Sequence, residues 1–327
     1  MIQTLSVRNF KSIKHLKLAC RRINIFIGEP NAGKSNLLEV LGFLSFLHYG
    51  KGMELREFVR YESVSNLFYD DYIDQKIEVA FDGRAMTLSF DGQRFKVLYG
   101  REGQQTEVLL MTADGPTGQS QVKDTAAFKF YRFRPRGRFP NKEPGFLKPP
   151  SGDNLLALLL TNKGLKTMVG HLLEPFGLKL GLRPQEGKIE FLKYQEEEAT
   201  IIAYPYSLVS DTLQRVIFYL VAAESNRDSI LVFEEPEAHA FPYYTKFLAE
   251  RIALDERNNQ YFISTHNPYF LLSVIEKAPK KDVNVVVAYH EEQQTRIRPL
   301  TEQDLEEILD LDMDVFFNAE RFLEAKG

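Results

Sequence analysis

Residues 28–35 read GEPNAGKS and match the pattern G-x-x-x-x-G-K-[ST] at every fixed position. Glycines in such a loop let successive backbone N–H groups turn inward around a phosphate. Lys34 would bring a positive charge to β- and γ-phosphate oxygens, and the Ser35 hydroxyl would be a ligand of Mg²⁺. The loop therefore predicts a site for a nucleoside triphosphate, with contacts from Gly28, Glu29, Pro30, Asn31, Ala32, Gly33, Lys34, Ser35 and Asn36.

Two adjacent acids end an apolar run at residues 229–237 (SILVFEEPE). A carboxylate at the end of a strand beside a phosphate loop is where P-loop NTPases hold their metal ion. The next carboxylate along the chain can orient a water molecule as a general base. We therefore expect Glu234 to hold Mg²⁺ together with Ser35, and Glu235 to be catalytic. The alternative is a solvated acidic turn after a core strand.

A second apolar run that ends in polar side chains occupies residues 260–268 (QYFISTHNP). His266 would lie at the carboxyl end of this strand, where its imidazole can hydrogen-bond to a γ-phosphate or to the attacking water. A lone histidine is more often an ordinary loop residue, but this one follows a phosphate loop and an acidic strand. His266 therefore joins Lys34 and Glu235 as an expected catalytic residue.

Ser210 and Asp211 precede an apolar stretch at residues 216–220, and either is a natural N-cap for a helix there. The free N–H groups at a helix N-terminus bind anions, so this segment could contact a phosphate. A well-capped core helix accounts for the same residues, and the residues alone leave the two interpretations open.

These residues lie toward both ends of the chain, and one sheet must bring them together. Residues 1–50 and 205–300 alternate apolar strands with helices, which is typical of a parallel α/β core. Residues 51–130 contain Asp-Gly pairs between alternating runs, which predicts an antiparallel β-meander lobe. Residues 131–204 are expected to form a loop and a helical insertion. The expected fold class is a single α/β P-loop NTPase head over residues 1–327.

The composition excludes several classes of protein. A net charge of −4 argues against general coating of nucleic acid, and Cys20 is the single cysteine, which excludes an internal disulfide framework. No apolar run approaches the roughly 18 residues that span a bilayer. Residues 2–7 read as a strand and not as a signal peptide. We therefore expect a cytoplasmic protein with no membrane partner.

Taken in order, these segments resemble those of the ABC-type ATPases, in the RecF/SMC/OLD-like branch (the AAA15/AAA21 family). The N-terminal lead-in of that branch is similar to residues 5–13 (LSVRNFKSI). Residues 28–35 are similar to the Walker A loop, and residues 230–235 are similar to the Walker B strand. Residues 209–215 are similar to the signature segment, residues 237–239 to the D-loop, and His266 to the switch histidine.

The resemblance implies an ATPase that uses ATP and Mg²⁺. It also implies that Ser210 of one subunit completes the site around Lys34 of a second subunit, in an ATP-dependent head-to-tail homodimer. The sequence departs from the family at residues 210–212, which read SDT where a glycine usually follows the serine. It also departs at Glu234, where aspartate is usual, and the family's Q-loop glutamine is not placed.

Two further partners are expected. Residues 131–139 (YRFRPRGRF) interleave arginine with aromatic residues, which suits contact with the phosphates and bases of DNA, although a solvated loop is the alternative. Residues 315–324 resemble the lead-in to a Toprim nuclease domain. Because the sequence has no room for that domain, we expect any cleavage to come from a separate effector or nuclease protein.

The expected function is an ATPase that serves DNA repair or defence against foreign DNA. The alternative, from a different class, is a slow nucleotide-gated switch that regulates a separate effector. A transporter ATPase fits the meander insertion less well. A P-loop kinase is a weaker candidate as well, because the pair of acids followed by His266 favours water as the phosphoryl acceptor.

Overall fold

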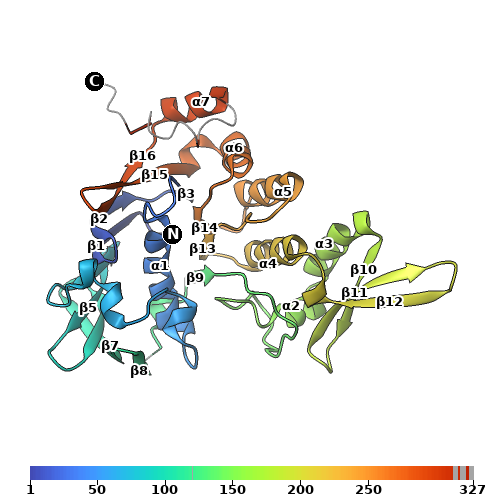
Figure 1. The fold of residues 1–327 in the computed structure, drawn as a ribbon, viewed down its shortest axis with the longest axis horizontal. Coiled ribbons are helices and arrows are strands. Elements are labelled where there is room, and N and C mark those ends of the chain that lie inside the picture. Colours follow the sequence, from blue (N-terminus) through green and yellow to red (C-terminus); the bar gives the residue numbers. More distant parts are fainter. Residues whose placement is uncertain (120, 312–315, 317–321, 324–327) are drawn as a thin grey trace.

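The computed structural model describes residues 1–119, 121–311, 316, 322 and 323. The segment expected to resemble a Toprim lead-in, residues 315–324, lies outside them except at those last three positions. Figure 1 shows the helix of residues 34–49 between two large sheets, further helices on the far side of the parallel sheet, and a smaller projecting lobe.

The central sheet has six strands in the order β16-β15-β3-β14-β13-β9, and only β16 is antiparallel to its neighbour. Segments far apart in the sequence therefore meet in this sheet, as the sequence predicted for the core. The strands are β3 (Ile23–Ile27), β9 (Phe128–Tyr131), β13 (Ile230–Glu234), β14 (Gln260–Ser264), β15 (Val283–Glu291) and β16 (Gln294–Pro299).

Alternation along the parallel strands gives this sheet two buried faces. On one face, Phe26, Val232 and Phe262 pack in the same apolar cluster as the residues of α1 (Lys34–Tyr49). On the other face, strand residues such as Phe233 and Ile263 join a cluster with residues of several helices. These helices include α4 (Asp211–Ser225), α5 (Pro242–Ala253), α6 (Pro268–Lys277) and α7 (Glu302–Leu311).

The second large sheet is antiparallel and covers the other side of α1, in the order β2-β1-β4-β5-β6-β7-β8. Its hairpins from β4 to β7 confirm the predicted meander. The strands are β1 (Thr4–Phe10), β2 (Ile13–Ala19), β4 (Ile77–Phe81), β5 (Arg84–Phe90), β6 (Phe95–Arg101), β7 (Gln104–Thr112) and β8 (Gly115–Gln119).

The lobe differs from the expected boundaries of 51–130 at both ends. The N-terminal hairpin β1–β2 belongs to the antiparallel sheet, because its buried face, which includes Leu5 and Val7, packs against α1. At the other end, β9 pairs with β13 in the parallel sheet. Short 3₁₀ turns (Leu55–Glu57, Val64–Leu67 and Tyr69–Asp71) connect α1 to β4.

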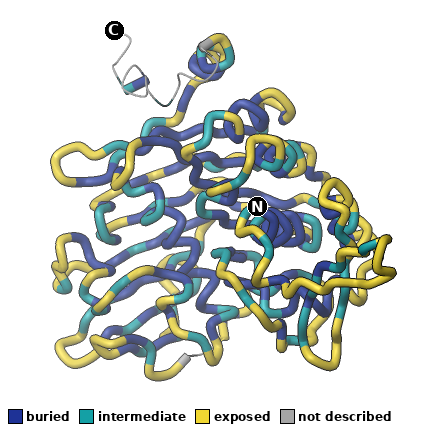
Figure 2. The backbone as a smooth tube through the Cα atoms, turned by 45° about the vertical axis from the view of Figure 1, so that its right-hand side comes forward, coloured by how far each residue is buried: buried dark blue, intermediate teal, exposed yellow. Residues whose placement is uncertain are grey.

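The insertion contains the expected helices, α2 (Leu155–Thr161) and α3 (Lys163–Leu173). It also contains a three-stranded antiparallel sheet that projects away from the core in Figure 1. Its strands are β10 (Leu178–Arg183), β11 (Lys188–Gln195) and β12 (Thr200–Pro205). Figure 2 shows that burial follows the central strands and α1, whereas hairpin turns are exposed.

Within the part of the chain that the structure describes, none of the helices combines the length and the apolar character needed to cross a membrane.

Candidate functional site

The loop between β3 and α1 has a backbone that only glycine permits at its two ends. Gly28 and Gly33 have φ angles of 135° and 91°. A Cβ atom on Gly28 would lie 2.1 Å from the Ala288 carbonyl oxygen, and one on Gly33 would lie 2.0 Å from Thr295 Oγ1. No described side chain caps the N-terminus of α1, so its N–H groups remain directed at the loop. The loop has the free donors that a phosphate needs.

Lys34 is folded into this loop. Its side chain is 5% exposed, and Nζ donates to the carbonyl oxygens of Gly28 and Glu29, each at 2.7 Å. Burial lowers the pKa of the Lys34 ammonium to about 8, against the opposing effect of Glu235 and Glu29. A buried cation whose hydrogen-bond partners, among the described residues, are carbonyl oxygens fits a site that receives phosphate.

Glu234 is the last residue of β13. Its carboxylate forms a hydrogen bond with the side chain of Ser35, the residue that directly follows Lys34. Burial alone would raise the pKa of Glu234, but the charge of Arg60, the bond with Ser35 and the charge of Arg132 bring it below its usual value. The carboxylate is therefore ionised. A hydroxyl and a carboxylate side by side are the hard oxygen donors that suit Mg²⁺, so these residues fit the metal expected here.

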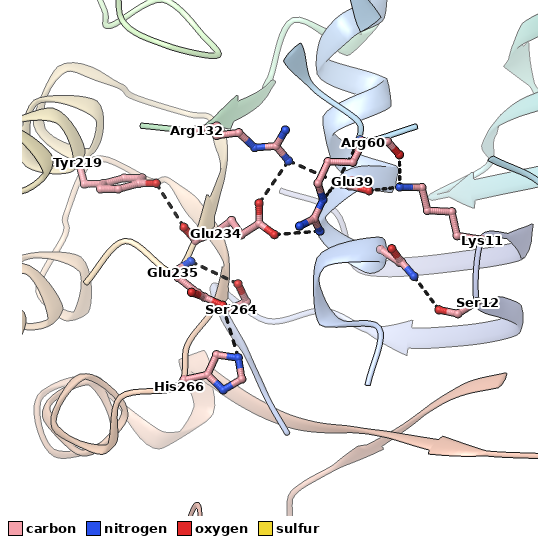
Figure 3. Close-up of polar contacts among 11 residues, drawn as sticks. Lys11, Ser12, Glu39, Arg60, Arg132, Tyr219, Glu234, Glu235, Ser264 and His266 are labelled. Atoms are coloured by element: carbon pink, nitrogen blue, oxygen red, sulfur yellow. Dashed lines mark hydrogen bonds and ion pairs between the residues drawn. The ribbon is translucent and has the colours of Figure 1, made fainter. Parts of the chain in front are cut away.

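Glu235 and His266 meet just beyond the ends of β13 and β14, which are paired up to Glu234 and Ser264. His266 Nε2 lies 3.4 Å from Glu235 Oε1, and Figure 3 marks this contact. Burial and the charge of Lys34 lower the pKa of His266, and Glu235 opposes them. The imidazole is therefore neutral at pH 7 and can either donate or accept a hydrogen bond.

Ser210 is one of the two residues expected to cap a helix here, and it is the N-cap of α4. Its hydroxyl accepts a hydrogen bond from the Leu213 backbone N–H at 3.3 Å. Two residues on, Thr212 Oγ1 donates to the His239 carbonyl oxygen at 2.5 Å. This hydrogen bond links the segment to the D-loop-like residues 237–239. Lys34, Ser35, Glu234, Glu235 and His266 gather at the sheet edge without Ser210.

Sequence reasoning missed a group of charged residues behind Glu234. Glu39 on α1 is fully buried, and Lys11, Arg60 and Arg132 all form ion pairs with it. Arg132 follows β9, which pairs with β13 in the parallel sheet. The available signal was Glu39 itself, an acid within an apolar helical stretch.

The arginine loop expected to meet DNA is partly engaged within the protein. Arg134 lies 3.8 Å from a Glu57 carboxylate oxygen, and Arg136 donates to Ser151 Oγ. Arg138 remains exposed. The loop is therefore not a freely solvated charge run, and contact with DNA stays a proposal.

Comparison with known proteins gives similarities to ATPase families. A family model described as "AAA domain, putative AbiEii toxin, Type IV TA system" matches residues 119–273. An uncharacterized protein of Methanocaldococcus jannaschii (MJECL10) is 34% identical over 110 residues, which cover 29% of this chain and 49% of that protein. The DNA replication and repair protein RecF of Anaeromyxobacter dehalogenans is 29% identical over 141 residues, 38% of this chain and 37% of that protein. An ATP/GTP phosphatase of Helicobacter pylori is 49% identical over 45 residues, 14% of this chain and 12% of that protein.

The chain therefore spans about half or less of the length of these curated relatives. Among solved structures, an Smc head bound to the C-winged helix domain of ScpA has a TM-score of 0.57 and 13% identity, covering 93% of this chain and 99% of that one. An Smc head bound to the C-terminal domain of ScpA, from Pyrococcus furiosus, has a TM-score of 0.53 and 12% identity, covering 95% and 98%.

The phosphate loop and the parallel sheet, together with the likeness to the Smc heads, give the chain the fold of a P-loop NTPase head. The RecF relatives, the AAA domain match and the Smc-like fold support an ABC-type ATPase of the RecF/SMC-like branch.

Proposed function

We propose that this head binds ATP with Mg²⁺ and hydrolyses it to ADP and phosphate. The observation that carries the proposal is the convergence of Lys34, the Ser35–Glu234 pair and the Glu235–His266 pair at one sheet edge. The relative called an ATP/GTP phosphatase supports it as well. The contacts to the phosphates would come from residues 28–36.

Each side chain has a role that follows from its surroundings. Glu235 accepts a proton from the attacking water as it adds to the γ-phosphorus, and the bond to the ADP oxygen breaks. His266 hydrogen-bonds to the water or to a γ-phosphate oxygen, while Lys34 neutralises charge on the β- and γ-phosphates. Mg²⁺, when bound by Ser35 and Glu234, adds charge stabilisation at the same oxygens.

A head-to-tail homodimer is part of the proposal, with Ser210 of one subunit facing the phosphate loop of the other. Two large apolar side chains near the signature and D-loop segments support a contact there. Leu208 is 76% exposed and Phe241 is 68% exposed, and the Thr212–His239 hydrogen bond ties the two segments together. Exposed apolar side chains of this kind favour a protein interface.

A role in a DNA transaction, either repair or defence against foreign DNA, rests on the likeness to RecF and on the arginine loop. A cytoplasmic location belongs to the same proposal, because the substrate is ATP and the chain has a single cysteine. The second candidate is a slow nucleotide-gated switch that holds a separate effector or nuclease. The unusual residues 210–212 favour it, and so does the ScpA domain bound to the similar Smc head.

The experiment that tests the proposal is phosphate release from ATP by wild type and by Lys34→Ala, with and without duplex DNA. We expect turnover in the wild type and a loss of ATP binding in the variant. Faster phosphate release in the presence of DNA favours the DNA role, whereas a slow rate of release that DNA does not change favours the switch. A wild-type protein that binds no nucleotide at saturating Mg²⁺ would contradict the proposal.

A further inference from the structure

Both carboxylate oxygens of Glu234 are engaged by arginines. Arg60 Nη2 lies 3.2 Å from Oε1, and Arg132 Nη2 lies 3.2 Å from Oε2. The Glu234 side chain is only 17% exposed, so these are partly desolvated charge-assisted contacts. Figure 3 shows the two guanidinium groups approaching the carboxylate from one side, with Glu235 and His266 on the other.

The same two arginines hold a second acid. Arg60 Nε donates to Glu39 Oε1 at 2.7 Å, and Arg132 Nη2 lies 3.3 Å from the same oxygen. Lys11 Nζ pairs with the other oxygen of Glu39. Three cations thus share two acids, and the group carries a surplus positive charge. If either arginine leaves Glu234, it still keeps a partner in Glu39.

The backbone around Arg60 is fixed independently of Glu234. Its N–H donates to Glu39 Oε1 at 3.2 Å, and its carbonyl oxygen accepts from Lys11 Nζ at 2.5 Å. Its side chain, in contrast, is 56% exposed. The guanidinium of Arg60 can therefore change partners while the segment between α1 and β4 stays in place.

We propose that Arg60 and Arg132 form a latch on Glu234 and compete with Mg²⁺ for its carboxylate. This inference rests on the proposed function, because it takes Glu234 as the metal-binding acid. In the free head the arginines hold both oxygens. Glu234 becomes available for Mg²⁺ only when at least one arginine withdraws to Glu39. The latch raises the Mg²⁺ concentration that the head needs to hold nucleotide, and it disfavours occupation by the metal alone.

The test is the binding of a fluorescent, non-hydrolysable ATP analogue as Mg²⁺ is titrated, so no turnover is involved. In Arg132→Met, the Mg²⁺ concentration at half-maximal binding should fall about tenfold, since one charge-assisted hydrogen bond no longer competes. Arg60→Met, a change at a half-exposed side chain, should shift it in the same direction. Arg56→Met is the matched control: Arg56 lies in the same segment and donates to the Glu62 carbonyl oxygen, so the midpoint should not move.

An unchanged or raised Mg²⁺ midpoint in both Arg60→Met and Arg132→Met, with analogue binding intact, would overturn the latch and leave the ATPase proposal standing. Weaker analogue binding at saturating Mg²⁺ with an unchanged midpoint would also overturn it, because the arginines would then be holding phosphate. A wild type that binds no analogue at any Mg²⁺ concentration would remove both proposals. Thermal unfolding without ligand identifies a variant that fails to fold, and Arg60→Met then decides alone.

Discussion

His266 Nε2 lies 3.4 Å from Glu235 Oε1, and each residue follows the end of one of two paired parallel strands. The pair is positioned by sheet register, because Glu234 pairs with Ser264, and Glu235 and His266 lie one and two residues beyond these paired positions. Glu235 has a positive φ of 43°, which turns its side chain at this point. A strained acid against a neutral histidine is suited to holding a water molecule.

We therefore expect His266→Asn to reduce ATP turnover by about 10²-fold while ATP binding is kept, as for loss of one group that assists proton transfer. Steady-state hydrolysis and equilibrium binding of a fluorescent ATP analogue measure the two quantities. A variant that loses binding as strongly as turnover would show that His266 holds the loop and does not act on the water.

Gly33 of the phosphate loop has a matched control in Gly52, which lies just beyond the end of α1. Gly33→Ala would place Cβ 2.0 Å from Thr295 Oγ1, whereas Gly52, with a similar φ of 78°, has no described atom within 4 Å. Both alanines carry the strain of a left-handed backbone, about 1–2 kcal/mol. We expect Gly33→Ala to be the less stable in chemical denaturation and to lose ATP binding, and Gly52→Ala to keep it. Equal losses in both variants would mean that the loop tolerates a Cβ.

Glu237 couples stability to pH. Burial raises the pKa of its carboxyl to about 7, against a hydrogen bond from Thr265 Oγ1 at 2.5 Å, and Oε2 has no partner among the described residues. The folded protein therefore binds this proton more tightly than the unfolded chain. The stabilisation is full below about pH 4.5, the value of an unfolded glutamate, and is lost as the pH rises through 7.

The loss amounts to about 3 kcal/mol at most. Urea denaturation at pH 5 and pH 8 should show a smaller fall in stability for Glu237→Gln than for wild type, because the amide stays neutral and can still accept from Thr265. The same fall in both proteins would contradict the assignment.

The composite site predicts complementation between two inactive variants. Ser210→Asp keeps an N-cap for α4 but places a negative charge toward a phosphate, and Lys34→Ala lacks the loop cation. A mixed dimer contains one site with the native Lys34 of one subunit and the native Ser210 of the other. Equal mixing should restore up to about a quarter of the wild-type turnover. If the mixture stays as inactive as its components, the two residues do not share a site across subunits.

Much of this head could be predicted from the sequence because its chemistry lies at the ends of local elements. The loop at residues 28–35, the acids after β13 and His266 after β14 each follow an apolar strand, and parallel strands bring their carboxyl ends together. The cap at Ser210 is similarly local.

The charge network could not be predicted in the same way. Arg60 and Arg132 meet Glu39 and Glu234 across separations that run from 21 positions (Glu39 to Arg60) to 174 positions (Arg60 to Glu234), and nothing local distinguishes them from surface arginines. The membership of β1 and β2 in the antiparallel sheet was missed for a related reason. Their alternation shows a half-buried hairpin, but which sheet it joins depends on packing against α1.

The measurement that tests the account most directly is the mass of Glu235→Gln in solution with Mg²⁺ and ATP, alongside its bound nucleotide. Because the variant keeps the phosphate contacts and lacks the general base, we predict a dimer with two ATP molecules trapped, reverting to monomer when ATP is removed. The same variant carrying Lys34→Ala should stay monomeric. A Glu235→Gln protein that binds ATP at saturation yet remains a monomer would contradict the proposed head-to-tail site.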